Sequence, residues 1–170
     1  EVIVESPTTC LRTLTEHESC VYALTTLQDL LVSGSYDCTI KFWDPSTWAC
    51  TRTLQAPSSV RSLLVFEDKL FVGLGFGKGI MVWSTSTWTL ERTLEGHSEG
   101  VTSLVMCGDA LASGSGDDTI KLWSTTTWTC ERTLEGHTDD VNMLVSTGDK
   151  LISGSSDDTI KIWSTTSWTC

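Results

Sequence analysis

The chain has 170 residues, enough for one ordinary globular domain, and 39% of them are hydrophobic, which is too many for a disordered protein. No apolar run approaches the roughly 18 residues of a membrane-spanning helix, so that class of protein is excluded. The net charge of −11 would repel a phosphate backbone. We therefore expect a folded domain with neither nucleic acid nor membrane as a partner.

Internal repetition dominates the sequence. Four series of residues recur at a spacing of 40, with Pro57 at the one place where a histidine is missing: Trp43, Trp83, Trp123 and Trp163; Trp48, Trp88, Trp128 and Trp168; Arg12, Arg52, Arg92 and Arg132; and His17, His97 and His137. Series that keep the same register indicate copies of one structural unit. Residues 1–170 are therefore interpreted as a single domain of four repeats.

The elements follow in chain order. Residues 8–15 resemble the last strand of a unit, and the units themselves span about 17–55, 57–95, 97–135 and 137–170. In the third unit, apolar alternation and turn signals such as Gly108-Asp109 predict four short strands, at 101–106, 111–115, 119–123 and 128–134. No segment shows a sustained helical period. Each unit is predicted to be a four-stranded antiparallel meander.

Such a meander has two apolar faces and cannot bury both alone. Stacking copies side by side buries them, either around an axis as a propeller or along a line as a solenoid. A period of 40 residues matches the length of one propeller blade. The predicted fold class is therefore all-β, a β-propeller with four blades in this chain.

One set of motifs carries a family resemblance. Gly136-His137, followed by Ser153-Gly154-Ser155-Ser156-Asp157 and then Trp163, resembles a blade of the WD-repeat β-propellers, although only Trp43-Asp44 is a literal Trp-Asp pair. The resemblance implies a structural hydrogen-bond relay in each blade, from Trp to Ser to His to Asp. The three sets are His17, Ser33, Asp37 and Trp43; His97, Ser113, Asp117 and Trp123; and His137, Ser153, Asp157 and Trp163.

The second unit departs from this pattern. Beside Trp83, an alignment at a constant spacing of 40 places Gly73, Pro57 and Gly77 where the other units have Ser, His and Asp. A blade without the relay loses several internal hydrogen bonds. We expect it to be looser than the others, or to be shaped by a ligand or a neighbour.

The ends of the chain suggest how the ring closes. The last unit stops where its outer strand should begin, and the resemblance implies that an N-terminal strand, residues 8–15, completes the last blade. WD-repeat propellers usually have seven or eight blades, so three arrangements remain open. Two chains form an eight-bladed ring as a homodimer, which we favour; or further blades belong to a longer chain; or four blades close alone.

Three features resemble catalytic or ligand sites and have structural explanations. The Ser, His and Asp set occurs three times, each time with a Trp, whereas a hydrolase has one such set. The seven cysteines include no C-x-x-C pair and no cluster with histidine. The glycine-rich segment 73–79 lies between strands, not before a helix. We therefore expect no enzyme activity, no cofactor and no metal, and reduced thiols in the cytoplasm or the nucleus.

Positions that differ between repeats indicate where a partner would bind. In WD-repeat propellers two variable positions per blade line one rim, which implies Tyr22, Arg61, Thr102 and Asn142 at the first, and Tyr36, Phe76, Gly116 and Ser156 at the second. Tyr and Arg are enriched in interface hot spots. Tyr22, Tyr36, Arg61, Phe76 and Asn142 are thus the predicted protein-binding rim. Nearby acids, such as Glu99 and Asp140, favour a basic ligand segment.

The predicted function is a non-catalytic scaffold that binds peptides or protein surfaces within a larger assembly. The Cys-x-Arg-Thr-Leu-x-Gly-His lead is similar to that of propellers attached to kinases and ubiquitin-ligase subunits, which implies substrate recruitment. The alternative is a self-assembling structural or engineered propeller with no dedicated ligand. Similarity between the third and fourth repeats supports this alternative, since both contain Gly-Ser-x-Asp-Asp-Thr-Ile-Lys-x-Trp-Ser-Thr-Thr.

Overall fold

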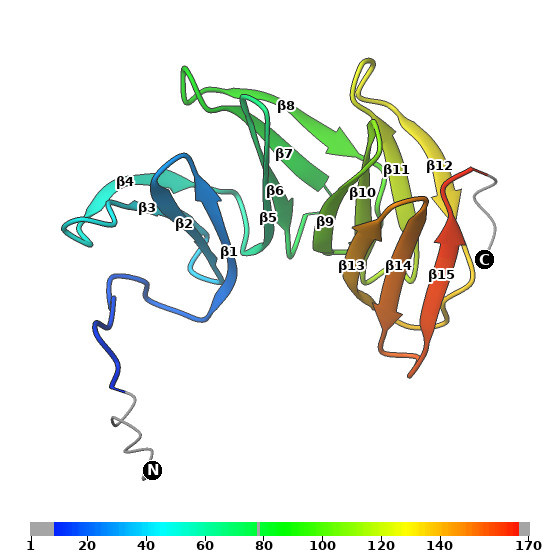
Figure 1. Cartoon of the computed structure of the whole chain (residues 1–170), viewed down its shortest axis with the longest axis horizontal. Helices are drawn as coiled ribbons and strands as arrows, with labels where there is room; N and C mark the ends of the chain where they lie inside the picture. The colour runs from blue at the N-terminus through cyan, green and yellow to red at the C-terminus, as the bar shows by residue number, and fades with distance from the viewer. Residues whose placement is uncertain (1–8, 78, 167–170) are drawn as a thin grey trace, which may run out of the picture.

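The computed structural model describes residues 9–77 and 79–166. These residues form fifteen strands and no helix, in four sheets (Figure 1). The first sheet holds β1 (Val21–Leu27), β2 (Leu30–Ser35), β3 (Thr39–Trp43) and β4 (Cys50–Gln55). The second holds β5 (Val60–Phe66), β6 (Lys69–Leu74), β7 (Gly79–Ser84) and β8 (Leu90–Glu95).

The third and fourth sheets repeat this order. The third holds β9 (Val101–Cys107), β10 (Ala110–Ser115), β11 (Ile120–Ser124) and β12 (Cys130–Leu134). Within the described residues the fourth has three strands, β13 (Val141–Thr147), β14 (Lys150–Ser155) and β15 (Ile160–Ser164). Within each sheet, every strand pairs antiparallel with the next along the chain. The predicted all-β meander is therefore confirmed.

In the third sheet the predicted strand boundaries agree with the observed ones to within one residue, except at the start of the outer strand. The outer strand of the third sheet begins at Cys130, two residues later than Trp128. Trp128 has a φ of 61° and its backbone N–H donates to the carbonyl of Ser124, which makes it part of the turn. Trp48 and Trp88 have the same left-handed conformation. The alternation of apolar residues could not reveal this, because it does not register the sign of φ.

The hydrophobic core lies between adjacent sheets in three layers. Between the first and second sheets, for example, Ile40 and Phe42 pack in one cluster with Val60 and Leu70. The equivalent layers lie between the second and third sheets and between the third and fourth. Each sheet thus covers the apolar face of its neighbour, with the inner strands β1, β5, β9 and β13 in contact one after another.

The four sheets form an open arc with two free ends (Figure 1). Residues 9–15 extend away from the first sheet and form no strand, and in the described chain the outer edge of β15 has no partner strand. The closure of the last blade by the N-terminal segment stays a prediction. No helix among the described residues is long and apolar enough to cross a membrane.

Candidate functional site

The third sheet contains a continuous hydrogen-bond relay. The indole Nε1 of Trp123 donates to the hydroxyl of Ser113 at 2.8 Å, and that hydroxyl lies 2.7 Å from Nε2 of His97. Nδ1 of His97 lies 2.8 Å from the Asp117 carboxylate. The backbone N–H of Ser98 also donates to this carboxylate. The relay therefore ties the inner turn of the sheet to strands β10 and β11.

The first and fourth sheets hold the same arrangement at nearly the same distances. His17 lies 2.7 Å from both Asp37 and Ser33, and Trp43 donates to Ser33 at 2.8 Å. The corresponding contacts of the fourth sheet join His137 to Asp157 and Ser153, both at 2.7 Å, and Trp163 to Ser153 at 2.9 Å. All twelve residues of the three sets are thus brought together as the sequence analysis expected.

Burial sets the electrostatics of the relay. Burial lowers the pKa of His97, even though the Asp117 charge opposes the shift. Burial raises the pKa of Asp117, but hydrogen bonds from Thr119 and the backbone of Ser98, and the contact with His97, outweigh it and leave the pKa lowered. The pair therefore favours a neutral imidazole beside an ionised carboxylate, which is a structural arrangement with no free nucleophile.

The second sheet shows that the alignment at a constant spacing of 40 was wrong there. Val72 pairs with Met81 just as Ser113 pairs with Lys121, so Val72, not Gly73, takes the place of the relay serine. The backbone N–H of Gly75 donates to Ser59, as that of Gly116 does to Gly100. Gly75 is therefore the member of the second rim series, where Phe76 was expected. Phe76 follows in the place of the turn aspartate, where Gly77 was expected.

Two compensating length changes cause this shift. The connection before β5 is one residue shorter than the connection before β9. The paired residues Gly73 and Ile80 are one residue further apart in the sequence than their equivalents, Gly114 and Ile120. The match between residues of the second repeat and those of the third is therefore shifted by one only from β5 to the turn after β6. As a result, the buried Nε1 of Trp83 has no hydrogen-bond partner among the described residues.

The first series of rim residues results from a β-bulge. In each sheet the pairing of the inner strand with the next skips one residue after the first valine, for example between Val60 and Ser62. The skipped residues are Tyr22, Arg61, Thr102 and Asn142. A bulged residue re-aims its side chain away from the ladder. This bulge explains why the position varies between repeats while the preceding valine does not.

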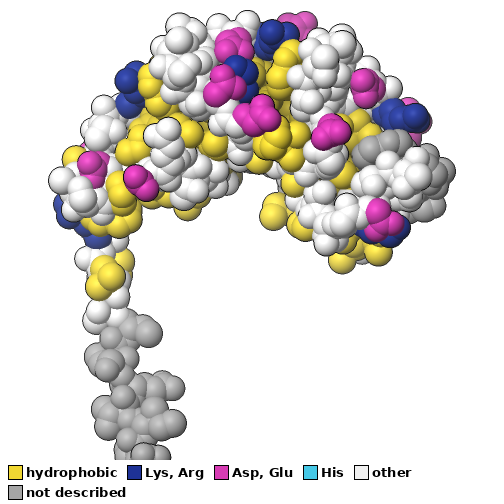
Figure 2. All heavy atoms as spheres, turned by 45° about the horizontal axis from the view of Figure 1, so that its top comes forward, with side chains coloured by type: hydrophobic (Ala, Val, Ile, Leu, Met, Phe, Trp, Pro, Cys, Tyr) yellow, Lys and Arg dark blue, Asp and Glu magenta, His cyan; other side chains and the backbone are white. Residues whose placement is uncertain are grey.

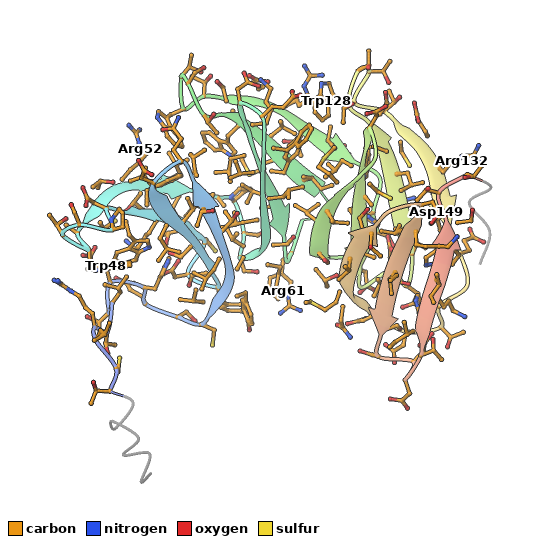
Figure 3. All side chains as sticks on the ribbon, viewed as in Figure 1. Trp48, Arg52, Arg61, Trp128, Arg132 and Asp149 are labelled. Carbon is orange, nitrogen blue, oxygen red and sulfur yellow. The ribbon has the colours of Figure 1, made fainter. Side chains whose placement is uncertain are left out.

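Two of these residues, Arg61 and Thr102, line a cleft between the sheets, which we call the inner-rim cleft. The guanidinium of Arg61 lies 4.8 Å from the centre of the Tyr22 ring. The ring of Tyr36 contacts those of Tyr22 and Phe76, at centroid distances of 6.2 and 5.9 Å. Figure 3 shows Arg61 on the concave side of the arc. One wall of the cleft is therefore aromatic.

Carboxylates form the opposite wall. Glu99 and Asp140 line the cleft, and a Cβ placed on Gly116 would meet the carboxylates of both. Asp118, Asp139 and Asp140 hold carboxylate oxygens within 4.8 Å of one another next to it. Asn142 lies apart from the aromatic wall and donates to Ser156 at 2.8 Å. The rim prediction thus falls into an aromatic group and a separate amide.

Sequence reasoning missed Ser59 as a cleft residue. Ser59 is almost fully buried and lines the cleft, and its hydroxyl has no partner among the residues that the structure describes. A buried hydroxyl without a partner is costly. The signal in the sequence that could have identified Ser59 is the missing residue before β5, because this deletion shifts Ser59 relative to the other repeats.

The other features singled out from the sequence lie elsewhere. The six cysteines of the described chain are free, with Cys107 buried and Cys10, Cys20 and Cys130 exposed. Within residues 73–77 and 79, the glycine-rich segment is the turn between two strands and opens no helix. It carries the cleft residues Gly75 and Phe76.

Comparisons with known proteins agree with this architecture. The model of the family described as WD domain, G-beta repeat, matches residues 8–44, 88–124 and 128–164, which is more than half of the chain. The matches leave out residues 45–87, most of the second repeat. A search of curated proteins returned no match.

Solved structures give the same result. The chain is similar to the computationally designed Ika4 protein, with 31% identity and a TM-score of 0.79 over 92% of this chain and 98% of that one. It is similar to the designed Ika8 protein, with 32% identity and a TM-score of 0.76 over 87% of this chain and 46% of Ika8.

A natural protein shares the fold. U3-55K is 22% identical with a TM-score of 0.84, over 93% of this chain and 53% of U3-55K. The chain thus spans about half the length of Ika8 and of U3-55K. With three family matches, three complete relays and these neighbours, the chain belongs to the WD-repeat family.

Proposed function

We propose that the chain is a non-catalytic scaffold that binds a basic peptide segment of a partner protein in the inner-rim cleft. The observation that carries this proposal is the pairing of the aromatic wall of Tyr36 and Phe76 with the acidic wall of Glu99 and Asp140. A Lys or Arg side chain between these walls would meet carboxylates on one side and ring faces on the other.

A further feature supports a bound peptide. Arg61 has no carboxylate in salt-bridge distance within the described ranges, so its guanidinium is available to a ligand carbonyl as well as to the Tyr22 ring. WD-repeat domains generally mediate protein interactions, and this cleft supplies a surface suited to that role.

The three relays favour a non-catalytic scaffold over an enzyme. Three copies of one Ser, His and Asp set serve three sheets, and each serine is engaged by a tryptophan. We infer a reducing location, the cytoplasm or the nucleus, because the six described cysteines are free. The proposed use is recruitment of a substrate, as in propellers attached to kinases or ubiquitin-ligase subunits.

Binding of fluorescent peptides tests the proposal. A library of seven-residue peptides with Lys or Arg at the centre, and a matched library with Glu there, is titrated with the chain. We expect saturable binding of the basic set, at least tenfold weakened in Tyr36→Ala/Arg61→Ala and in Glu99→Gln/Asp140→Asn. The control variant Thr126→Ala, at the turn before β12, should leave it unchanged. Equal binding by the rim variants and the parent chain would refute the cleft as the site.

A second candidate function is a self-assembling structural propeller without a dedicated ligand. Apolar side chains exposed at both ends of the arc favour it, as does the likeness to the designed Ika4 and Ika8 proteins. A pull-down from cell extract separates the two candidates. A saturable partner supports the scaffold, whereas recovery of the chain's own copies alone supports self-assembly.

A further inference from the structure

The last sheet exposes side chains that every other sheet buries. Ile160 is 74% exposed and Ile162 54%, whereas their equivalents Ile120 and Leu122 are 0% and 2% exposed. Ile120 and Leu122 are buried because the next sheet covers them. We call the uncovered surface the trailing face; it comprises Met143, Val145, Ile160 and Ile162.

The first sheet exposes the complementary surface. Val21 is 48% exposed, although its equivalents Val60, Val101 and Val141 are fully buried against the preceding sheet. Leu24 is 64% exposed at the corresponding leucine position. We call Val21, Leu24 and Trp48 the leading face. Hydrophobic side chains reach the surface at both ends of the arc (Figure 2).

A glycine in β14 indicates what the trailing face receives. A Cβ on Gly34 would lie 2.3 Å from Cγ1 of Val60, and one on Gly114 would lie 2.8 Å from Cγ1 of Val141, so these glycines admit the first valine of the next sheet. Gly154 is the equivalent residue, and a Cβ there would meet nothing within 4 Å. The space that glycine leaves at this position fits a valine such as Val21.

The N-terminal segment shares one local contact with the outer strands. The Sγ of Cys10 donates to the carbonyl of Arg12 at 3.3 Å. Cys50 in β4 and Cys130 in β12 make the same contact at the same distance. Residues 10–14 are therefore suited to form a fourth strand beside β15, whose outer edge has no partner among the described residues, and adding a strand removes an exposed edge.

A cation–π contact links each of the outer strands β4 and β8 to the next sheet. The guanidinium of Arg52 lies 4.7 Å from the ring centre of Trp88, and Arg92 lies 5.6 Å from that of Trp128. Arg12 and Trp48 have the same separation in sequence. A strand of residues 10–14 on the sheet that precedes β1 would place Arg12 over Trp48, which is half-exposed in the single chain.

We propose that two copies of this chain close into one eight-bladed ring. The trailing face of each copy packs on the leading face of the other, and residues 10–14 of each form the fourth strand beside β15 of the other. A second copy is the occupant because this chain itself carries all three missing parts: the leading face, the valine for Gly154 and the outer strand. The proposal rests on the second candidate function, self-assembly.

Two is the smallest number of copies that covers both end faces of each chain. A trailing face on a leading face is a head-to-tail contact, and such contacts form a ring when the rotation closes. The open arc in Figure 1 keeps the two faces of one chain apart. Two identical contacts related by a twofold axis cover all four faces without exposing a new one.

The mass of the full chain in solution tests the ring. Light scattering should give twice the 18.6 kDa of one chain. A folded species of 18.6 kDa, or a larger assembly or filament, would overturn the proposal. The ring and the peptide-binding proposal fail separately, because Gly154, Ile160 and Leu24 do not line the inner-rim cleft.

Gly154→Ile is the sharpest variant. Nothing within 4 Å obstructs the new side chain in one chain, so its circular dichroism should match the parent, but it would block Val21 of the other copy. We expect the mass of one chain. Glu131→Ile, which adds the same side chain to the exposed outer strand β12, should keep the doubled mass. A doubled mass for Gly154→Ile would refute the contact.

Two further variants test the pairing of faces and the exchanged strand. Leu24→Asp places a charge on the leading face and should also give single chains. If this variant dimerises as the parent does, the leading face is not in the contact and the proposal is wrong. Leu11→Pro/Arg12→Pro removes the N–H that faces β15, whichever residue of the two supplies it. We expect the dissociation constant of the dimer to rise about tenfold in this variant. The control Leu11→Thr/Arg12→Lys should leave the dissociation constant unchanged. Equal dissociation constants would exclude strand exchange.

Discussion

Ser113 joins Trp123 to His97 in the relay of the third sheet, and its oxygen accepts the indole N–H at 2.8 Å. The ionised Asp117 carboxylate can only accept, so Nδ1 of the neutral His97 donates to it. Nε2 of His97 is then the acceptor for the hydroxyl hydrogen of Ser113. A second proton on the imidazole would leave the hydroxyl hydrogen of a fully buried serine without an acceptor.

Ser113→Ala should therefore be strongly destabilising. It leaves the Trp123 N–H and Nε2 of His97 buried without a partner, which costs about 2 to 4 kcal/mol of unfolding free energy. Urea unfolding followed by tryptophan fluorescence measures the loss. Ser98→Ala, an exposed serine that takes part in the relay only through its backbone N–H, should change stability by less than about 0.5 kcal/mol.

The two buried indoles should respond differently to loss of their N–H. Trp123→Phe removes a donor that binds Ser113, whereas Trp83→Phe removes one that has no partner in the described chain. We expect Trp123→Phe to cost about 1 to 3 kcal/mol more than Trp83→Phe in the same unfolding assay. Equal costs would mean that the missing relay of the second sheet has no energetic consequence.

Acidification should destabilise the fold in two stages. The pKa of His97 is lowered from 6.5 by burial, so the unfolded chain binds this proton more readily, and the stabilising contribution present above pH 6.5 is lost as the pH falls. Asp37, Asp117 and Asp157 have a pKa lowered from 3.8, so their contribution is lost at still lower pH.

The midpoint of urea unfolding, measured between pH 8 and 3, checks this order. His97→Gln should be less stable at pH 8 and should show a shallower loss between pH 7 and 5, because the group that titrates is gone. An unchanged slope in that variant would show that burial of His97 does not contribute to the acid sensitivity.

The contact between the second and third sheets should be sensitive to one methyl group. A Cβ on Gly100 would lie 2.3 Å from the carbonyl oxygen of Gly75, and backbone cannot move aside at low cost. Gly100→Ala should cost about 1 to 3 kcal/mol. Gly116→Ala meets the end of the Glu99 side chain at 3.1 Å, which can rotate away, and should cost less than half as much. Thermal unfolding compares the two variants.

Sequence reasoning succeeded where the repeat is regular. The twelve relay residues keep fixed offsets in three repeats, so their alignment alone identified which side chains would meet. It failed in the second repeat, because one deletion before β5 and one insertion after β6 cancel in the spacing of Trp43 and Trp83. Only the pairing of Val72 with Met81 revealed the shift.

The amino-acid sequence by itself determined the four-fold repeat, the all-β meander and the relay, since each depends on residues within one repeat. Tertiary structure alone decided three features of the described residues: the cleft of Tyr36, Phe76 and Glu99, the unpaired hydroxyl of Ser59 and the unfilled space at Gly154. Each of these depends on the distance between neighbouring sheets, which sets what packs across the interface. That distance follows from the summed packing of whole sheets, and no local pattern of residues encodes it.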